Sequence, residues 1–218
     1  MKFDFHQFDD VFYNGTVMVK YRRGLVRAYD CQRSCLLTKG CRGFNMQWID
    51  DIAAVGYCDL VDMRLAKALS SKSNYSVYAL CPSGMIFYST TSRCYKVIRK
   101  RKSWSESELH CSSLYDQAHL MEIYDSIQQE LFKNMTEDFI ETNPTNLSFG
   151  LWLGASRSTE GVDVVWSSTL ESVISSSYSN FEDGEPTEQA SGKDCLRSFR
   201  NQWSMSLCSE IKAFVCEY

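Results

Sequence analysis

The sequence contains little proline, little glycine and no long apolar run. Of its 218 residues, 3 are proline and 11 are glycine, which excludes collagen-like repeats and a low-complexity chain rich in these residues. The apolar fraction of 44% is ordinary for a globular protein and excludes global disorder. No stretch approaches the ~20 consecutive apolar residues of a membrane-spanning helix.

Strong net charge and catalytic motifs are also lacking. The net charge is −4, from 23 basic and 27 acidic residues, so nothing indicates a nucleic-acid partner. There is no Gly-x-Ser-x-Gly motif, phosphate loop or dinucleotide fingerprint. The histidines, His6, His110 and His119, lie in no metal-binding or nucleophile motif. We therefore expect a protein that is not an enzyme, with a hydrolase as the weakest hypothesis.

Cysteine, in contrast, is abundant. The chain has ten, an even number that favours disulfides and an oxidising compartment. The first ten residues contain no apolar leader segment, so a cytosolic thiol-rich protein is the rival interpretation. We expect a secreted or extracellular protein, given as a mature form, a fragment or a chain without its leader. Four candidate N-glycosylation sites favour the same route: Asn14, Asn74, Asn134 and Asn146.

Charge and cysteine divide the chain into two parts. Residues 1–80 carry 11 basic residues, 8 acidic residues and four cysteines. Residues 81–218 carry 12 basic residues, 19 acidic residues and six cysteines. Because both cysteine counts are even, each part could close its own disulfides. We expect two domains, residues 1–80 and residues 81–218, which abut without a flexible linker.

The first part is expected to combine strands with one helix. The Asn14-Gly15 dipeptide between two short apolar segments is a strong hairpin signal. Residues 28–38 predict a helix with Cys31 and Cys35 on one face, because residues four apart face the same way. The expected strands are residues 12–13, 17–19, 44–48 and 75–80.

The second part begins with helix signals. A capping-box pattern at residues 103–106 predicts a helix to about residue 114, which would bury Trp104, Leu109 and Cys111. Asp125 could cap a second helix. The inner face of that helix would carry Ile127, Leu131, Phe132 and Met135.

Strand signals follow these helices, and this order predicts an α+β fold without βαβ units. Residues 167–191 are serine-rich and poorly periodic, which indicates a functional loop or a wrong assignment. The expected strands are residues 149–153, 162–166, 194–199 and 213–218.

The cysteine spacing of the first part is Cys31-x3-Cys35-x5-Cys41, followed by Cys58. This arrangement resembles a PAN/Apple domain over about residues 10–80. By position, the resemblance implies the bridges Cys31–Cys58 and Cys35–Cys41, which would pin a helix on a small antiparallel sheet. A small disulfide-clamped domain of another kind is the alternative, since a domain of ~80 residues needs such cross-links in any case.

A longer series of motifs marks residues 81–218. It consists of Cys81-Pro82-Ser83-Gly84, Cys94-Tyr95, Trp104, Cys111, Leu151-Trp152-Leu153-Gly154, Glu185-Pro186-Thr187, Cys195, Trp203, Cys208 and Phe214-Val215-Cys216-Glu217-Tyr218. The series resembles a long-form C-type lectin-like domain, which implies two helices, antiparallel sheets and a long loop region. By position, the implied bridges are Cys81–Cys94, Cys111–Cys216 and Cys195–Cys208.

Sugar-binding members of that family hold a calcium ion in the long loop through a Glu-Pro-Asn motif, a second Glu before an Asp-Cys pair, and a Trp-Asn-Asp motif. Of these ligand positions, only the first glutamate matches, as Glu185; the others hold Thr187, Lys193, Ser204 and Met205. Calcium takes about 6–8 oxygen ligands, and a thioether or an ammonium group supplies none. We therefore predict no cofactor, no calcium at the usual lectin site and no other metal.

The long loop remains the expected contact surface, because rigid scaffolds display recognition on loops. Of its two aromatics, Tyr178 is a candidate ligand contact, whereas Phe181 has a core role at least as readily. Glu182 and Asp183 could serve a secondary calcium position, although a solvated acidic loop is the preferred explanation. The ligand-binding candidates are Tyr178, Glu185, Thr187, Lys193, Ser204 and Met205.

A basic run, Arg-Lys-Arg-Lys at residues 99–102, is expected between a strand and the first helix of the second part. It could bind heparin-like polyanions or be cleaved by a protease. A solvated loop is the more common explanation of such a run.

Together these observations predict an extracellular recognition or adhesion protein. It would bind a protein or glycan ligand non-covalently, without the usual calcium–sugar site. The alternative is a true carbohydrate-binding lectin that uses a non-standard or secondary site. The domain pairing is similar to that of secreted lectin-like proteins of invertebrates, for which immune roles are often proposed. Nucleic acid is not expected as a partner, and the ligand and the oligomeric state are left open.

Overall fold

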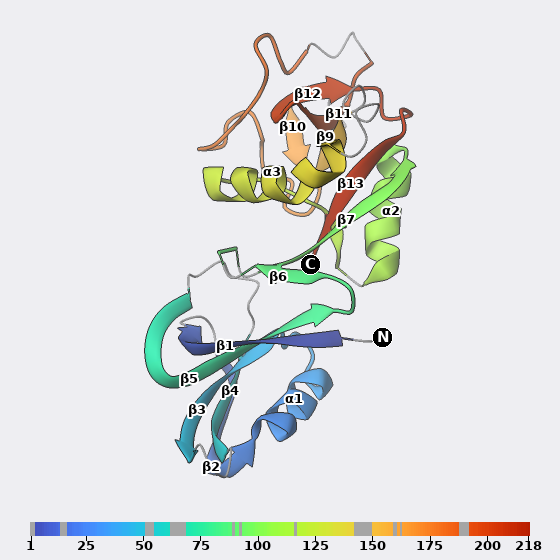
Figure 1. Ribbon diagram of the computed structural model, residues 1–218. Coiled ribbons are helices and arrows are strands. Elements are labelled where there is room, and N and C mark those ends of the chain that lie inside the picture. Colours follow the sequence, from blue (N-terminus) through green and yellow to red (C-terminus); the bar gives the residue numbers. More distant parts are fainter. Residues whose placement is uncertain are drawn as a thin grey trace. The chain divides into compact units, whose positions relative to one another are not determined.

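The computed structural model describes residues 3–13, 17–50, 55–61, 69–88, 90–91, 93–115, 117–141, 150–158, 161, 163–187 and 192–218. The chain divides into two compact units, Met1–Cys94 and Tyr95–Tyr218 (Figure 1). The division groups the segment between Cys81 and Cys94 with the first unit, whereas the sequence predicts a boundary at residue 80. Both units combine helix with antiparallel sheet, so the α+β prediction is confirmed.

The first unit is built around a five-stranded antiparallel sheet with the strand order β1-β5-β3-β4-β2. The expected strands at residues 44–48 and 75–80 lie within β3 and β5. The elements are β1 (Phe3–Tyr13), β2 (Val17–Arg27), α1 (Ala28–Leu37), β3 (Gly43–Asp50), β4 (Val55–Val61), β5 (Leu69–Pro82) and β6 (Ile86–Tyr88).

The hairpin expected around Asn14-Gly15 is wrong in its pairing. Residues 14–16 lie outside the described residues, but β1 and β2 stand at opposite edges of the sheet. β1 pairs with β5, and β2 pairs with β4. A turn preference acts on two residues, whereas a long antiparallel ladder satisfies backbone groups along both strands. The distant partners therefore decide the pairing.

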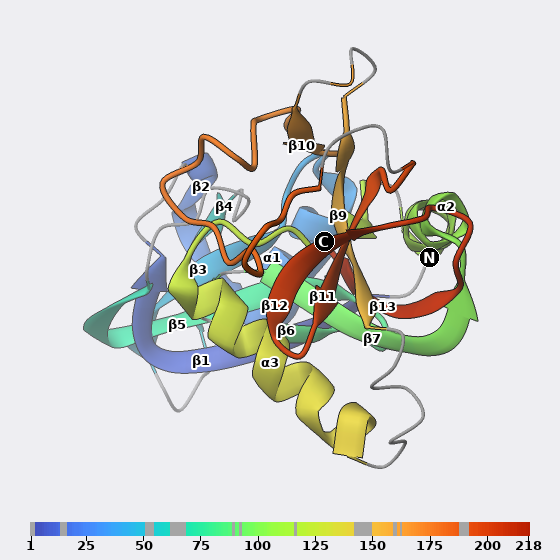
Figure 2. The same cartoon turned by 90° about the horizontal axis from the view of Figure 1, so that it is seen from above.

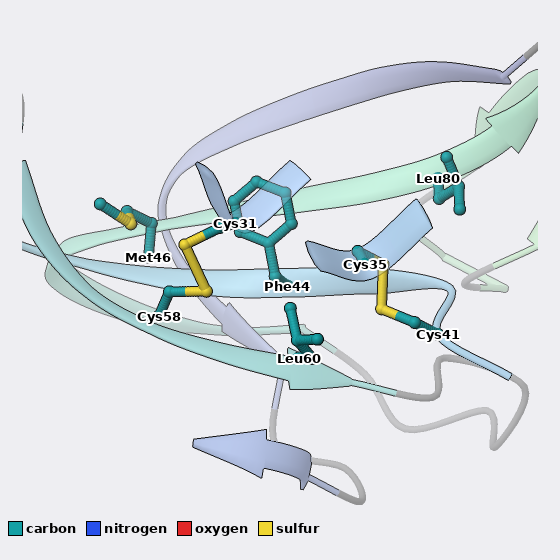
Figure 3. Packing of buried hydrophobic residues seen from close by; sticks show 8 residues of the cluster. All are labelled: Cys31, Cys35, Cys41, Phe44, Met46, Cys58, Leu60 and Leu80. Carbon is teal, nitrogen blue, oxygen red and sulfur yellow. A yellow bond between two sulfur atoms is a disulfide. The ribbon is translucent and has the colours of Figure 1, made fainter. Parts of the chain in front are cut away.

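Two disulfides fix α1 on this sheet (Figure 3). The cysteines Cys31 and Cys35 are both 1% exposed on the inner face of α1, as the four-residue spacing predicts. Cys31 bonds to Cys58 of β4, and Cys35 bonds to Cys41 just before β3. These are the two pairs that the PAN/Apple resemblance implies. The ring of Phe44 lies between them in Figure 3 and is fully buried.

The second unit contains a twisted sheet with the strand path β12-β11-β9-β13-β7, and β10 and β8 add to β9 and β13. Most pairs are antiparallel, but β9 and β13 are parallel. The elements are β7 (Arg93–Lys102), α2 (Trp104–Leu114), β8 (His119–Leu120), α3 (Ser126–Glu141), β9 (Leu151–Arg157), β10 (Val164–Trp166), β11 (Cys195–Phe199), β12 (Gln202–Ser206) and β13 (Lys212–Glu217).

The remaining disulfides are also the pairs that the resemblance implies. Cys111–Cys216 joins α2 to β13, and Cys195–Cys208 joins β11 to the turn after β12. The third bond is Cys81–Cys94. No cysteine of the chain is left as a free thiol.

Both helix starts in the second unit follow the predicted capping. The Ser103 amide donates to the Glu106 carboxylate (3.0 Å), and the Glu106 amide donates to the Ser103 hydroxyl (3.4 Å). Before α3, the Asp125 carboxylate accepts from the Gln128 amide at 2.7 Å.

The predicted inner faces of these helices are wrong at Leu109 and Ile127. Leu109 is 69% exposed and Ile127 is 56% exposed. The disulfide turns Cys111 toward β13, and Leu109, two residues away, lies about 200° around the helix from it. In α3, Gln128 and Gln129 are buried instead, because both amide groups have hydrogen-bond partners.

Strand β9 forms the centre of the second unit, with Trp152 fully buried. The Trp152 indole donates to the Lys102 carbonyl (2.9 Å), and the Trp104 indole of α2 donates to the Leu153 carbonyl (2.9 Å). A Cβ at Gly154 would lie 2.5 Å from the Leu120 carbonyl oxygen, so only glycine allows β8 to approach β9 this closely.

The basic run at residues 99–102 lies inside β7 rather than in a loop between a strand and α2. β7 pairs with β13, and this long ladder carries the strand to the residue before the Ser103 cap. In the part of the chain that the structure describes, no helix is both long and apolar enough to cross a membrane.

Candidate functional site

The long loop after β10 is held at its middle by one strand, β12. The Trp203 amide donates to the Asn180 carbonyl (2.8 Å), and the Glu182 amide donates to the Trp203 carbonyl (2.9 Å). Residues 167–187 contain no helix or named strand, as the serine-rich sequence predicts. Backbone hydrogen bonds to β12 therefore order a loop that lacks regular structure (orange in Figure 2).

An aromatic cluster fixes the same segment. The rings of Tyr178, Phe181 and Trp166 each meet Trp203 edge-on, at centroid distances of 5.8, 5.6 and 5.8 Å. The indole of Trp203 is fully buried and donates to the Gln129 side chain of α3 at 2.9 Å. Tyr178 and Phe181 are both half-buried, so the exposed edge of Tyr178 stands on a rigid base.

The carboxylate of Glu185 closes the far end of the described loop. Its Oε2 atom accepts from the amides of Thr187 (2.7 Å) and Met205 (3.1 Å). Three of the sequence candidates, Glu185, Thr187 and Met205, are thus brought together. The contacts to Thr187 and Met205 are through the backbone, and the Met205 side chain itself is 1% exposed.

Arg157, at the end of β9, supplies a positive charge beside the backbone of Thr187. Its Nη2 donates to the Thr187 carbonyl (2.6 Å), and its Nε donates to the Asp194 carboxylate (3.1 Å). The Arg157 side chain is only 7% exposed, whereas that of Asp194 is 45% exposed. The guanidinium therefore links the end of β9 to Thr187 and to Asp194. The Oε2 atom of Glu185 has backbone amides as its hydrogen-bond donors.

The two other candidates are not among the hydrogen-bond partners of Arg157 or Glu185 described above. Ser204 is 3% exposed and its hydroxyl accepts from Nε of Arg197 (3.1 Å). Lys193 is exposed on the segment before Asp194.

The described residues of this region offer few of the oxygen ligands that a calcium ion takes. Of the five positions that match the family's ligand positions, only Glu185 carries a carboxylate, and its Oε2 already accepts two amide hydrogens. Arg157 places a nearly buried cation on the same loop. A calcium site needs about 6–8 oxygen ligands and gains affinity from negative charge. Within the described residues, no group of three or more His, Cys, Asp or Glu side chains could hold a metal.

A second anchor holds the start of the loop. Glu122 is fully buried, and its carboxylate accepts from the Ser168 amide (2.8 Å), the Ser168 hydroxyl (2.6 Å) and the Tyr124 hydroxyl (2.5 Å). Burial and the adjacent Glu122 carboxylate raise the pKa of Tyr124 well above its usual range, so this phenol stays a proton donor.

Two of the four glycosylation candidates can be placed. Asn74 is exposed in β5 with a φ of 61°, and Asn134 is exposed on α3. Asn14 and Asn146 lie outside the described residues.

Sequence reasoning missed Arg157 and Glu122 and did not identify Trp203 as the base of the loop. Arg157 lies four residues beyond the strand predicted at residues 149–153, and Glu122 stands between two predicted elements. A charged residue that lies within four residues of a buried strand is only a weak sequence signal of a functional site. Neither position would stand out before the partners, Asp194 and Ser168, are known to be near.

The comparisons with known proteins agree with this architecture. A family model described as "Lectin C-type domain" matches residues 100–218. A "C-type lectin" of Micrurus corallinus is 22% identical over 74% of this chain and 98% of its own length. "Snaclec alboaggregin-B subunit alpha" of Trimeresurus albolabris is 26% identical over 63% of this chain and 82% of its own length.

Solved structures share the fold. Human lithostathine aligns with a TM-score of 0.52 at 20% identity, over 63% of this chain and 98% of its own. The carbohydrate-recognition domain of the mouse scavenger receptor C-type lectin aligns with a TM-score of 0.50 at 24% identity, over 63% of this chain and 95% of its own. Since the family model covers more than half of the sequence, this chain belongs to the C-type lectin domain family.

Proposed function

We propose that the second unit binds a protein or glycan ligand non-covalently through the long loop, without a calcium ion at the usual lectin site. The bound surface would include the exposed edge of Tyr178 and the region around Glu185, Thr187 and Lys193. Aromatic side chains on a rigid support are frequent anchors of such interfaces. The protein would act in recognition or adhesion and would not carry out catalysis.

The observation that supports this proposal is the hydrogen-bond network of Arg157 and Glu185. A guanidinium and two backbone amides satisfy the loop groups that a calcium ion would otherwise neutralise. The loop is thereby ordered before any ligand arrives, which reduces the entropy cost of binding. Ser204 and Met205 would act from beneath the surface, through the hydroxyl contact with Arg197 and the amide contact with Glu185.

A melting experiment tests the calcium part of the proposal. The full chain would be unfolded thermally in about 5 mM calcium chloride and, separately, in excess chelator. This calcium concentration is enough to fill even a weak extracellular calcium site. We expect the same Tm in both conditions. A Tm that rises with calcium in the native chain but not in Glu185→Gln would contradict the proposal.

A glycan array with and without chelator tests the ligand class. Chelator-insensitive binding that weakens in Tyr178→Ala would support the loop as the site. Tyr29→Ala is the matched control, because Tyr29 is 69% exposed on α1 and far along the chain from the loop. Sugar binding that chelator abolishes would favour the alternative, a true lectin with an unconventional ion site. Equal loss in both tyrosine variants would remove the loop from the proposal.

We further infer that the first unit is PAN/Apple-like and that the protein is secreted or extracellular. The support for the domain type is the helix α1, which two disulfides fix on an antiparallel sheet in the implied pairing. The support for the compartment is that all ten cysteines are paired, since disulfides persist in oxidising environments. Intact mass before and after reduction tests the inferred compartment, with about two Da gained per bridge.

A further inference from the structure

The strand β7 is unusually basic for the part of the chain in which it lies. Residues 81–218 contain 12 basic residues against 19 acidic ones, and β7 alone holds six of the basic residues within ten positions. It contains no acidic residue. The positive charge of an otherwise acidic part of the chain is therefore concentrated on one strand.

Three lysines of this strand lie near one helix, α2. Lys96 is paired with Cys216 of β13, and Cys216 is bonded to Cys111 of α2. Two residues on, Ile98 is paired with Phe214, whose ring meets the imidazole of His110 at 5.6 Å. Register and ring contact thus place this stretch of β7 beside the middle of α2.

The electrostatics of His110 show that the charges converge there. Burial lowers the pKa of His110, and the charges of Lys102, Lys100 and Lys96 lower it further. The three ammonium groups therefore add a smaller, charge-driven effect to that of burial. Lys96, Lys100 and Lys102 of β7, together with His110 of α2, are named the β7 lysine cluster.

The cluster is open to solvent, and one carboxylate, that of Glu106, interacts with it at a distance. Lys100 is exposed, and Lys96, Lys102 and His110 are partly exposed. Among the residues that the structure describes, no ion pair joins the three ammonium groups to a carboxylate. The nearby carboxylate of Glu106 is engaged in the helix cap: hydrogen bonds from Ser103 lower its pKa, and the charge of Lys102 adds to this effect.

We propose that the β7 lysine cluster binds a linear sulfated polysaccharide. The six residue steps from Lys96 to Lys102 span at most about 20 Å of strand, so these lysines form a narrow strip that matches repeated anionic groups on an extended chain. Lysine ammonium groups act as point charges and bind sulfate without a fixed fork geometry. Outside β7, residues 81–218 carry an excess of acidic residues. These would repel the phosphates of a wide nucleic-acid duplex, which disfavours nucleic acid as the ligand.

This site is independent of the long loop and of calcium. It would add a second, charge-driven contact to the recognition proposed above, and its failure would leave that proposal unaffected. The charged contacts predict binding that weakens steeply with salt, because each contact releases bound counterions.

The first test uses immobilised heparin as the sulfated probe and the full chain as the analyte. We expect binding at low salt that Lys100→Ala/Lys102→Ala weakens about tenfold, at roughly half a decade per lost contact. The matched control is Lys133→Ala/Arg200→Ala, which removes the same charge from α3 and from the β11–β12 turn. Equal weakening in the two double variants would overturn the proposal, since it would indicate net charge alone.

The second test needs no variant and therefore does not depend on how a variant folds. His110 would be titrated by NMR in the native chain, with and without a sulfated heparin oligosaccharide. Sulfates beside the lysines should raise the pKa of His110, because they offset the positive potential. An unchanged His110 pKa at saturating oligosaccharide, or equally tight binding of duplex DNA at the same charge concentration, would refute the site.

Discussion

Replacing Arg157 with methionine would separate its charge from its packing. Methionine keeps an apolar stem of similar length but has no guanidinium, so the bonds to the Thr187 carbonyl and the Asp194 carboxylate are lost. A hydrogen bond from a charged donor contributes about 1.5–3 kcal/mol. Because Asp194 is 45% exposed, its ion pair adds only about 0.2–1 kcal/mol. The expected loss is therefore about 2–4 kcal/mol.

Two measurements check this magnitude. A loss near 3 kcal/mol lowers the Tm by about 6–12 °C in a chain of this size. Hydrogen exchange gives the local view: the amides of Thr187 and Met205 bond to Glu185, and their protection should fall by about 100-fold if the loop opens. The control is Arg200→Met, which removes the same charge from an exposed turn residue.

The result that would refute the reasoning is unchanged protection of the Thr187 and Met205 amides in Arg157→Met. Glu185 and the backbone alone would then hold the loop. Equal effects in Arg200→Met would also contradict it, since they would indicate a general charge effect. Chelator should change neither variant, because the contacts of Arg157 involve no metal.

Three further predictions concern the scaffold. Glu122→Gln should lower the free energy of unfolding by about 1.5–3 kcal/mol in a urea titration, because an amide NH2 would face the donors of Tyr124 and Ser168; no loss would contradict the buried-anchor role. Removing the Cys111–Cys216 bond by a double change to alanine should cost roughly 4–5 kcal/mol by chain entropy, since it closes a 105-residue separation; a loss below 1 kcal/mol, about a quarter of this, would contradict that reasoning. Finally, burial raises the pKa of Glu210, but the hydrogen bond and charge of Lys212 outweigh burial and lower this pKa below 4.5. The ionised Glu210 therefore stabilises the fold fully above pH 4.5, and this stabilisation is lost as the pH falls through the lowered folded pKa. An acid titration of stability should show a smaller loss in Glu210→Gln than in the native chain, and an identical profile would contradict this.

Local signals in the sequence predicted those elements that depend on neighbouring residues. The capping box at residues 103–106 and the Asp125 cap place the starts of α2 and α3 correctly, because cap geometry needs only three or four residues. The four-residue spacing of Cys31 and Cys35 placed both on the inner face of α1 for the same reason. The absence of periodicity after residue 167 correctly predicted a loop without regular structure.

Predictions failed where a distant partner decides. Leu109 has the polarity of a core residue, but the bond from Cys111 to β13 rotates it into solvent. The Asn14-Gly15 signal favours a local hairpin, yet β1 and β2 each pair with strands that come later in the chain. In both cases a non-local contact outweighs a local preference.

Cysteine spacing and motif order are properties of the chain alone, and they carried the resemblance to the C-type lectin fold. That resemblance in turn implied the disulfide pairs that the structure contains. The prediction of no calcium at the usual lectin site also rests on the sequence, because ligand chemistry depends on residue identity. Only the tertiary structure brought Arg157 to Thr187 and Asp194, and Glu122 to Ser168. Charges far apart in sequence gain their effect from distance and burial, and those are set by the fold.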